Sequence, residues 1–274
     1  MDLHTVETLL RPTRLDELPP WQPGMAWLAG GTWLFTEPQP QVKTLVDLQR
    51  LGWDELAVTE AGLVIGATCV MSRLVEAEFP EQWGAIAALR RGVHALASFK
   101  VQNVATVVGN LCLALPAGTF APVMMALGAR YEVLSPGGAA WIEAVDFQTG
   151  ARRTILQPGD VVRRVLIPRE FLTWQTTYQR ICVASAGLAL AIVVTAYNPM
   201  TQQVRVGIGA VSPAPKLLTF AGMPTAEEVA IALNTAIPLE DCIEDDQASA
   251  TYRREMARVL LGRSLAPFYG PTRS

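Results

Sequence analysis

The sequence of 274 residues has little charge and few side chains for metal or acid–base chemistry. Charged residues make up 17% of the chain, against about 25% in a typical soluble domain. There are only 2 histidines, and the 4 cysteines lie far apart without a Cys-x-x-Cys pair. These numbers exclude the usual metal-ligand spacings and leave little for a Ser-His-Asp triad. We therefore expect no metal site and interpret the cysteines as buried free thiols.

The sequence also lacks a basic field and a long apolar run. With Lys+Arg 22 against Asp+Glu 25, it has no excess of positive charge to hold a phosphate backbone, so nucleic acid is not an expected partner. The most apolar run, 181–194, is interrupted by Ser185 and is shorter than the ~20 residues that span a bilayer. We interpret it as a buried strand. Residues 1–10 show no signal-peptide pattern, so we expect a cytoplasmic protein without a membrane span.

Hydrophobic residues are abundant, at 50% of the chain, and the length favours two domains. In the first part, short apolar strands such as 25–29 alternate with helical patterns, of which 71–99 is broken at Phe79-Pro80. The stretch 101–109 is predicted as a loop. A strand at 161–168, closed by proline, ends this part, and we place the domain boundary near Phe171.

Beyond the boundary, long apolar strands precede helices. The segments 182–196 and 204–211 are joined through Asn198-Pro199, which predicts an antiparallel hairpin. Helices are predicted at 226–233 and from about 250 to 265.

The hairpin contains Gly207-Ile208-Gly209, which invites comparison with a dinucleotide-binding fingerprint. That fingerprint must open a helix, whereas Pro213 and Pro215 follow here. We therefore interpret these glycines as positions of close packing.

Two other glycine-bearing segments, 28–32 and 103–110, place small residues beside hydroxyl or amide side chains. In a turn, this composition presents backbone N–H groups to an anionic oxygen. Each segment taken alone is more often an ordinary turn. Neither contains the Gly-Lys-Ser/Thr of a nucleoside triphosphate-binding loop.

In their order and spacing, these motifs resemble the FAD-binding medium subunit of the molybdenum hydroxylases, which include xanthine dehydrogenases, aldehyde oxidoreductases and aerobic carbon monoxide dehydrogenases. The resemblance covers almost the whole chain. The matching segments are the Arg11-Pro12 pair, the Ala29-Gly30-Gly31-Thr32 loop, the strand end Ile65-Gly66-Ala67, and residues 102–110, 116–122, 158–168, 204–215 and 246–257.

The resemblance implies an α+β fold. A PCMH-type FAD-binding domain of two subdomains would cover residues 1–170, with a split near residue 57, and a smaller domain of antiparallel sheet and helices would cover 171–274. An extended FAD would lie between the subdomains. The residues implied to hold it are Leu28, Ala29, Gly30, Gly31, Thr32, Trp33, Thr106, Val108, Gly109, Asn110, Thr119 and Val162. No catalytic base is implied on this chain, because the flavin carries the redox chemistry.

The resemblance also implies partners. Electrons would start at a molybdopterin centre on a large subunit, cross 2Fe-2S clusters on a small subunit and reach FAD on this chain before they leave to an external acceptor. The implied assembly is a heterotrimer or a dimer of heterotrimers. An independent flavin oxidase of the vanillyl-alcohol type is a weaker reading, because it would need its own substrate pocket and base.

Four positions depart from the family pattern. Val108 replaces a glycine, and a valine there would crowd the diphosphate or fail to adopt a positive φ. Thr119 replaces an acidic residue and so removes a charge-assisted acceptor. Trp33 is either a stacking or a packing residue. Arg180 either pairs with a partner acid or a phosphate, or is a solvated charge at a strand end. The alternative function is therefore a structural subunit with weakened or lost FAD binding.

Overall fold

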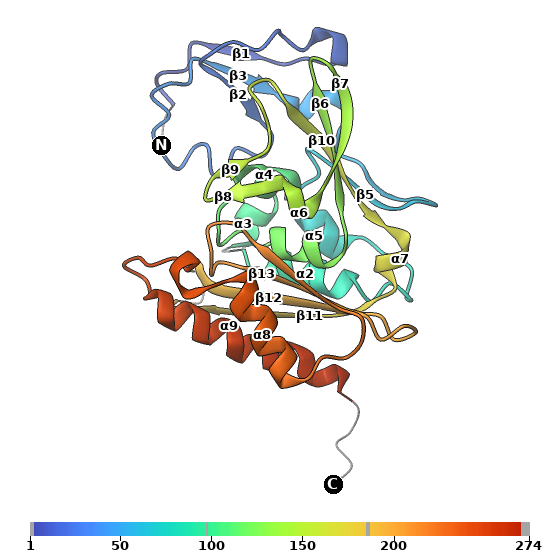
Figure 1. Cartoon of the computed structure of the whole chain (residues 1–274). Coiled ribbons are helices and arrows are strands. Elements are labelled where there is room, and N and C mark those ends of the chain that lie inside the picture. The colour runs from blue at the N-terminus through green and yellow to red at the C-terminus, as the bar shows by residue number, and fades with distance from the viewer. Residues whose placement is uncertain (1–2, 97, 185–186, 270–274) are drawn as a thin grey trace.

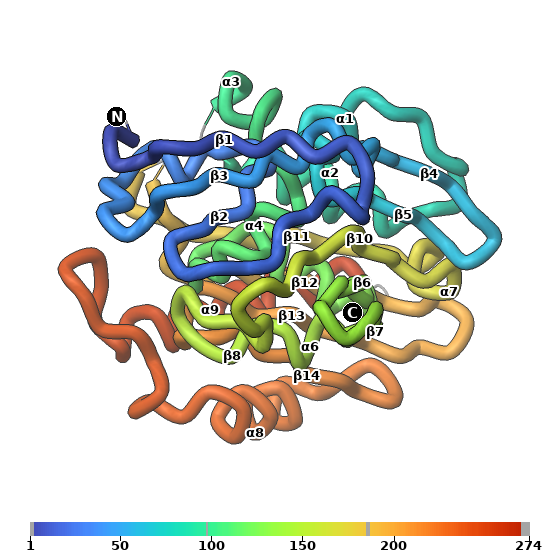
Figure 2. Tube along the Cα trace, turned by 90° about the horizontal axis from the view of Figure 1, so that it is seen from above, coloured from blue at the N-terminus to red at the C-terminus, as the bar shows by residue number. Residues whose placement is uncertain are grey.

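Three main sheets follow one another along the chain in the computed structural model, which describes residues 3–96, 98–184 and 187–269 (Figure 1). The first is parallel, in the order β1-β3-β2, and its strands lie side by side in Figure 2. Its strands are β1 (Thr8–Leu10), β2 (Met25–Leu28) and β3 (Thr44–Asp47). The expected strand at 25–29 is thus confirmed to within a residue.

The second sheet is antiparallel, in the order β4-β5-β10-β6-β7. Its strands are β4 (Leu56–Val58), β5 (Gly62–Gly66), β6 (Arg130–Ser135), β7 (Gly138–Glu143) and β10 (Val161–Pro168). The smaller elements of this half are the strands β8 (Gln148–Gly150) and β9 (Arg153–Thr154) and the 3-10 helices η1 (Leu15–Glu17) and η2 (Leu48–Leu51).

Short helices lie between the second sheet and the C-terminal sheet (Figure 1). They are α1 (Ser72–Glu76), α2 (Ile86–His94), α3 (Phe99–Gln102), α4 (Val107–Leu113), α5 (Ala121–Ala126), α6 (Ala144–Phe147) and α7 (Arg169–Leu172). The break at Phe79-Pro80 is confirmed between α1 and α2. The loop predicted at 101–109 is confirmed only over 103–106, because α3 extends to Gln102 and α4 begins at Val107. Burial of Val107 and Leu111 stabilises α4 and outweighs the weak helix propensity of valine.

The C-terminal sheet is antiparallel, in the order β11-β12-β13-β14. Its strands are β11 (Gln175–Cys182), β12 (Ala189–Tyr197), β13 (Val204–Gly209) and β14 (Lys216–Phe220). The hairpin of β12 and β13 is confirmed, and the Asn198 side chain accepts from the Met200 N–H at its turn (2.9 Å). The single strand expected over 181–194 is wrong. The chain reverses between Cys182 and Ala189, where the Gly187 N–H donates to the Ala184 carbonyl (2.8 Å).

Two helices cover the outer face of this sheet: α8 (Ala226–Ala236) and α9 (Ala250–Leu265) (Figure 1). Both were predicted, α9 at its observed bounds and α8 with an end three residues too early. The 3-10 helices η3 (Leu239–Asp241) and η4 (Ala266–Phe268) complete the chain. Thr225 and Glu228 form a capping box at the start of α8, and Ser249 caps α9. These local signals explain why the helices could be found from the sequence.

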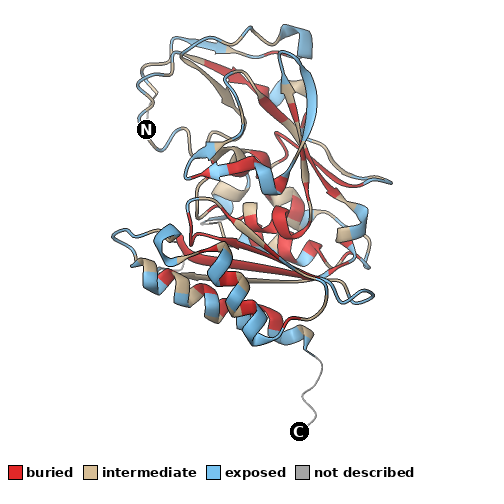
Figure 3. Ribbon diagram, viewed as in Figure 1, coloured by how far each residue is buried: buried red, intermediate tan, exposed pale blue. Residues whose placement is uncertain are grey.

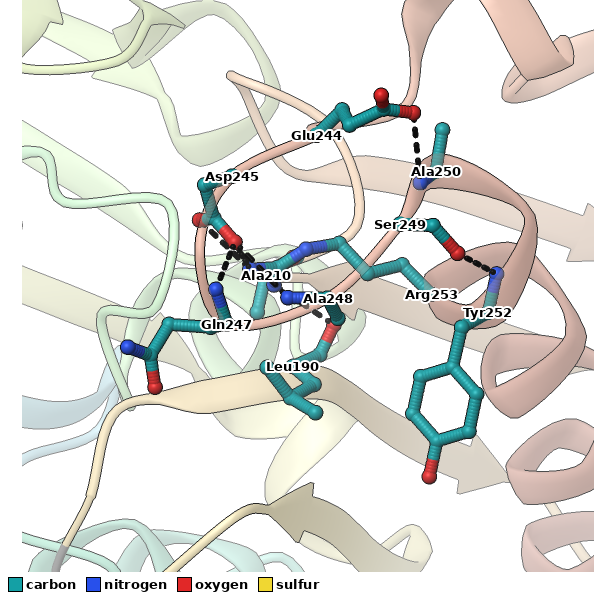
Figure 4. A network of polar contacts seen from close by, with 10 residues as sticks. All are labelled: Leu190, Ala210, Glu244, Asp245, Gln247, Ala248, Ser249, Ala250, Tyr252 and Arg253. Carbon is teal, nitrogen blue, oxygen red and sulfur yellow. Dashed lines mark hydrogen bonds and ion pairs between the residues drawn. The ribbon is translucent and has the colours of Figure 1, made fainter.

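A buried arginine fixes the start of α9 to the sheet (Figure 4). Arg253 is only 3% exposed. It donates to both carboxylate oxygens of Asp245 (2.7 Å each) and to the carbonyls of Leu190 (3.3 Å) and Ala210 (3.0 Å). The hydrogen bonds from Arg253 lower the pKa of Asp245. This network joins the segment before α9 to the strands beneath it.

The inner face of the C-terminal sheet shares one core with the short helices, and Figure 3 shows buried residues on both. Helix α5 packs on β13. A Cβ on Gly207 would lie 2.0 Å from the Pro122 carbonyl oxygen, and one on Gly209 would lie 2.6 Å from Pro122 Cγ. Close packing as the role of these glycines is therefore confirmed. Arg205 on β13 donates to the carbonyls of Met125 and Ala126 (2.9 Å each).

No helix in the described part of the chain has the length and apolar character needed to cross a membrane. Within the same residues, no group of three His, Cys, Asp or Glu side chains is placed to hold a metal ion.

Candidate cofactor-binding site

A cleft of about 260 Å³ lies where the loop after β2 meets the segment before α4. Ala29 and Gly30 line it from one side, and Val104 and Thr106 from the other. The structure thus brings together the two glycine-bearing segments that the sequence singled out. The remaining lining residues are Gln49, Asp54, Thr68 and Val70.

Gly30 makes the closest approach between the two segments. A Cβ at this position would lie 2.2 Å from the Val104 carbonyl oxygen and 3.1 Å from the Ala105 Cα. Both are backbone atoms, so no side-chain movement would relieve the overlap. Only glycine permits this contact. Its neighbour Gly31 has φ +67, a conformation that other residues rarely adopt.

The loop that contains these glycines has unpaired backbone donors. Among the described residues, none accepts a hydrogen bond from the N–H groups of residues 30–34. The loop turns back on itself through bonds from Phe35 N–H to the Gly31 carbonyl (3.0 Å) and from Thr36 N–H to the Trp33 carbonyl (2.9 Å). Successive free N–H groups on a curved backbone are suited to bind anionic oxygens.

Trp33 lies in this loop and is half-buried. Its indole Nε1 is buried without a hydrogen-bond partner. No other aromatic ring of the described residues stacks on it.

The second segment uses its polar groups within the protein. Thr106 is the N-cap of α4, and its hydroxyl accepts from the Gly109 N–H (3.0 Å). A Cβ on Gly109 would lie 2.8 Å from that hydroxyl oxygen, so glycine leaves room for the cap. The Asn110 side chain accepts from the Phe120 N–H (3.3 Å) and thereby joins α4 to α5. These residues stabilise the helix start that forms one wall of the cleft.

Val108 does not have the effect expected from its replacement of glycine. It is the second residue of α4, is 4% exposed and belongs to the hydrophobic core. It is not among the residues with positive φ, and it does not line the cleft. The expected steric conflict with a diphosphate is therefore wrong, because the helix directs this side chain into the core.

Thr119 and Val162 are buried away from the cleft lining. Thr119 is 4% exposed, its hydroxyl has no hydrogen-bond partner, and its carbonyl accepts from the Tyr178 hydroxyl (3.5 Å) on β11. Val162 is 3% exposed in the core on β10. The predicted residues that do not line the cleft are Leu28, Gly31, Thr32, Trp33, Val108, Gly109, Asn110, Thr119 and Val162.

Five lining residues were not among the predicted contact residues: Gln49, Asp54, Thr68, Val70 and Val104. The hydroxyl of Thr68 is buried without a partner although the residue is 8% exposed. An unpaired buried hydroxyl costs about 1–3 kcal/mol, which a ligand would offset by bonding to it. Asp54 lies 3.6 Å from the Arg73 guanidinium. The sequence signal for Thr68 was its place directly after the strand end Ile65-Gly66-Ala67.

Arg180 is not a solvated charge. It is half-buried on β11, and its guanidinium donates to the Gly187 carbonyl and lies 3.1 Å from the Cys182 sulfur. It therefore belongs to the turn between β11 and β12. All four cysteines are free, as expected, but only Cys69 is fully buried.

Comparisons with known proteins agree with this architecture. Residues 5–170 match the family described as "FAD binding domain in molybdopterin dehydrogenase". The carbon monoxide dehydrogenase medium chain of Afipia carboxidovorans is 28% identical over 253 residues, which are 87% of this chain and 86% of that protein. The xanthine dehydrogenase/oxidase of Gallus gallus is 29% identical over 189 residues, which are 63% of this chain and 13% of that protein.

Solved structures show the same fold. The Cu,Mo-CO dehydrogenase in its cyanide-inactivated form has a TM-score of 0.80 at 23% identity, over 95% of this chain and 97% of that chain. Quinoline 2-oxidoreductase from Pseudomonas putida 86 has a TM-score of 0.78 at 21% identity, over 97% of this chain and 98% of that chain. Since the family match spans more than half of the sequence, the chain belongs to the FAD-binding medium subunits of the molybdenum hydroxylase family of oxidoreductases, and its cofactor is FAD.

Proposed function

We propose that this chain is the electron-transfer subunit of a molybdenum hydroxylase complex, in which FAD takes electrons from 2Fe-2S clusters of a partner and passes them to an external acceptor. The observation that carries this proposal is the cleft where Gly30, the first residue of the loop 30–34 with free N–H groups, lies opposite Thr106. When bound, FAD supplies the redox chemistry, and the protein supplies position and electrostatics.

The residues at the cleft fit the diphosphate of FAD. Gly30 lets the two backbone segments meet at the cleft, because any Cβ there would overlap the Val104 carbonyl oxygen, and Thr68 offers a buried hydroxyl without a partner. The cleft of about 260 Å³ is smaller than the ~300–1,000 Å³ of most ligand pockets. It therefore suits the diphosphate, and the flavin and adenine ends would extend beyond it.

Neutral donors would hold the diphosphate. The lining contains no lysine or arginine, and its single carboxylate, Asp54, faces Arg73. Backbone N–H groups therefore carry the recognition of the anion, and we expect FAD affinity to depend only weakly on salt.

The resemblance and the positions of the sheets support the same division of the chain. Residues 1–170 would form the FAD-binding domain, split near residue 57 where the second sheet begins, and residues 171–274 the C-terminal domain. All of the predicted contact residues would then lie in the first domain.

We further propose a large molybdopterin-binding subunit and a small 2Fe-2S subunit as partners, in a cytoplasmic heterotrimer or dimer of heterotrimers. Substrate hydroxylation would take place on the large subunit. The similarity to the medium chain of a carbon monoxide dehydrogenase supports this assembly.

The alternative, a structural subunit with weakened or lost FAD binding, now depends on Thr119 and Trp33. The burial of Val108 in the core removes the steric argument. If the missing carboxylate weakens binding, Thr119→Asp would raise FAD affinity relative to the uncharged control Thr119→Asn. Because Thr119 is buried away from the cleft lining, the folded fraction of both variants is measured first.

The test is the visible spectrum and the released flavin of the chain, expressed with its presumed partner subunits and then alone. We expect near-stoichiometric FAD in the complex and reduction of its flavin band when the substrate of the complex is added. An assembled complex without flavin would instead establish the structural alternative. A flavin that is bound but never reduced through the partner would refute the electron route.

A further inference from the structure

Strand β7 forms an open edge of the second sheet. It is the last strand in the order β4-β5-β10-β6-β7, and no other strand of the described chain pairs with its outer side. Residues 138–141 are exposed, and their sequence is Gly-Ala-Ala-Trp. Natural edge strands are usually protected by lysine, proline or a bulge. This edge has none of them, and its small side chains leave the backbone accessible.

Charged and aromatic side chains line the outer face of the sheet beside this edge. Arg164 on β10, Glu132 on β6 and Trp141 on β7 are paired across the strands in one row. Arg130 precedes Glu132 by two residues and so shares its face. The guanidinium carbons of Arg130 and Arg164 lie 5.7 and 5.8 Å from the Trp141 ring centroid. The guanidinium groups of Arg130 and Arg164 therefore lie over the edge strand β7.

Positive charge is in excess in this row. Glu132 already faces two guanidinium groups, at 3.1 Å from Arg163 and 2.6 Å from Arg164. Arg130 forms no ion pair with any described residue, and its Nε is buried without an acceptor. Glu143 lies opposite Arg130 in the strand register but does not form an ion pair with it. Burial lowers the pKa of Arg205, and the charge of Glu143 opposes part of that shift. A carboxylate that reached Arg130 would supply the missing partner.

We propose that the β7 edge binds an extended, acidic segment of another protein chain. The segment would add a strand outside β7 through backbone hydrogen bonds, at the usual spacing of about 4.8 Å. One of its carboxylates would bind Arg130 beside Trp141 in a charge-assisted pair.

Charge complementarity favours this occupant over two others. A second copy of this chain, paired edge to edge, would place the same arginines against each other and so would be repelled. A free phosphate would neutralise Arg130 but would leave the backbone edge of β7 unpaired.

A photocrosslinking experiment in cells that produce the whole complex tests the site. Ala139→benzoylphenylalanine places a photoreactive group on the exposed edge, and Val58→benzoylphenylalanine on β4, at the opposite edge of the same sheet, is the matched control. We expect position 139 alone to crosslink to one acidic segment of a different chain. Arg130→Glu should abolish the crosslink, and Arg130→Lys should retain it. A crosslink to a second copy, a crosslink indifferent to Arg130→Glu, or none at all would overturn the proposal.

A defined probe separates strand addition from simple anion binding. The probe is a labelled peptide of alternating valine and glutamate, with a valine–lysine peptide as control, measured by fluorescence anisotropy on the full chain. We expect Arg130→Glu to weaken binding of the acidic peptide about tenfold or more, as for the loss of one charge-assisted pair. We also expect slower amide hydrogen exchange at 138–143. Binding without this protection, or complete displacement by inorganic phosphate, would show an anion site only and refute the strand addition.

Discussion

The two segments that meet at the cleft use their polar groups in opposite ways. Residues 30–34 leave their backbone N–H groups unpaired, whereas Thr106, Gly109 and Asn110 bond to one another or to α5. Similar compositions of glycine, hydroxyl and amide residues therefore produce two different structures. The first segment is free to bind a ligand, and the second makes a rigid wall against which the ligand is held.

The contact between the two segments should be the most sensitive point. Gly30→Ala would place a Cβ 2.2 Å from the Val104 carbonyl oxygen, and such overpacking costs about 1–3 kcal/mol of unfolding free energy. We expect denaturant unfolding to show this decrease in unfolding free energy, and we expect the purified variant to have lost its bound FAD.

Gly262→Ala is the control for this substitution, because its Cβ would meet no atom within 4 Å in α9. It should stabilise the chain by up to about 1 kcal/mol. A Gly30→Ala protein with unchanged stability and flavin content would show that the close approach is dispensable.

In the second segment, which forms the wall of the cleft, the N-cap of α4 should contribute to the stability of the protein. Thr106→Val removes the acceptor of the Gly109 N–H, and the loss of such a cap costs about 1 kcal/mol. Thr106→Ser keeps the hydroxyl and should retain most of the stability that the cap contributes. If the valine protein unfolds at the same denaturant concentration as the wild type, then the cap does not stabilise this wall.

Among the unpaired donors that line the cleft, the Thr68 hydroxyl should be needed for FAD binding and not for folding. Thr68→Val replaces a buried, unpartnered hydroxyl by a methyl group of similar size. Without FAD the stability should rise by about 1–3 kcal/mol, because a buried unsatisfied hydroxyl is removed. FAD affinity, measured by flavin fluorescence titration, should fall several-fold. A fall in stability without FAD would mean that the hydroxyl has a structural partner.

The thiols of Cys69 and Cys112, which lie close to the two segments, should both react slowly with alkylating reagents. Burial raises the pKa of Cys69 to about 11 and that of Cys112 to about 12, so at pH 8 only about one molecule in a thousand or fewer carries the reactive thiolate. Iodoacetamide should therefore label Cys182 first, and labelling of Cys69 and Cys112 should require unfolding or strongly alkaline pH. Rapid labelling of Cys69 at pH 8 would show that its side of the cleft opens.

Elements with their own local signals could be predicted from the sequence. The helix α9 was predicted at its observed bounds, and Ser249 caps its start; the hairpin of β12 and β13 was predicted because Asn198-Pro199 separates two apolar runs. Strand β11 was not found, since polar residues such as Gln175 and Thr177 interrupt its pattern. Its stability comes from pairing with β12, which no local window contains.

The glycines of the site could be predicted from the sequence, but the directions in which its side chains point could not. Gly30 could be singled out because two adjacent glycines mark a close approach. The direction of Val108 into the core follows from its place in α4, and the unpaired hydroxyl of Thr68 follows from what surrounds it. Both depend on tertiary contacts, which sequence spacing does not contain.

The packing of α5 against β13 has a consequence for how the protein is made. Pro122 touches Gly207 and Gly209, which the ribosome adds long after α5 has left the exit tunnel. Until then, the apolar flank of the nascent flavin-binding half has no cover. A gene fragment that stopped at residue 170 would encode every predicted flavin contact and still yield a polypeptide prone to aggregation. The C-terminal residues are therefore needed to cover the apolar surface of the N-terminal part of the chain.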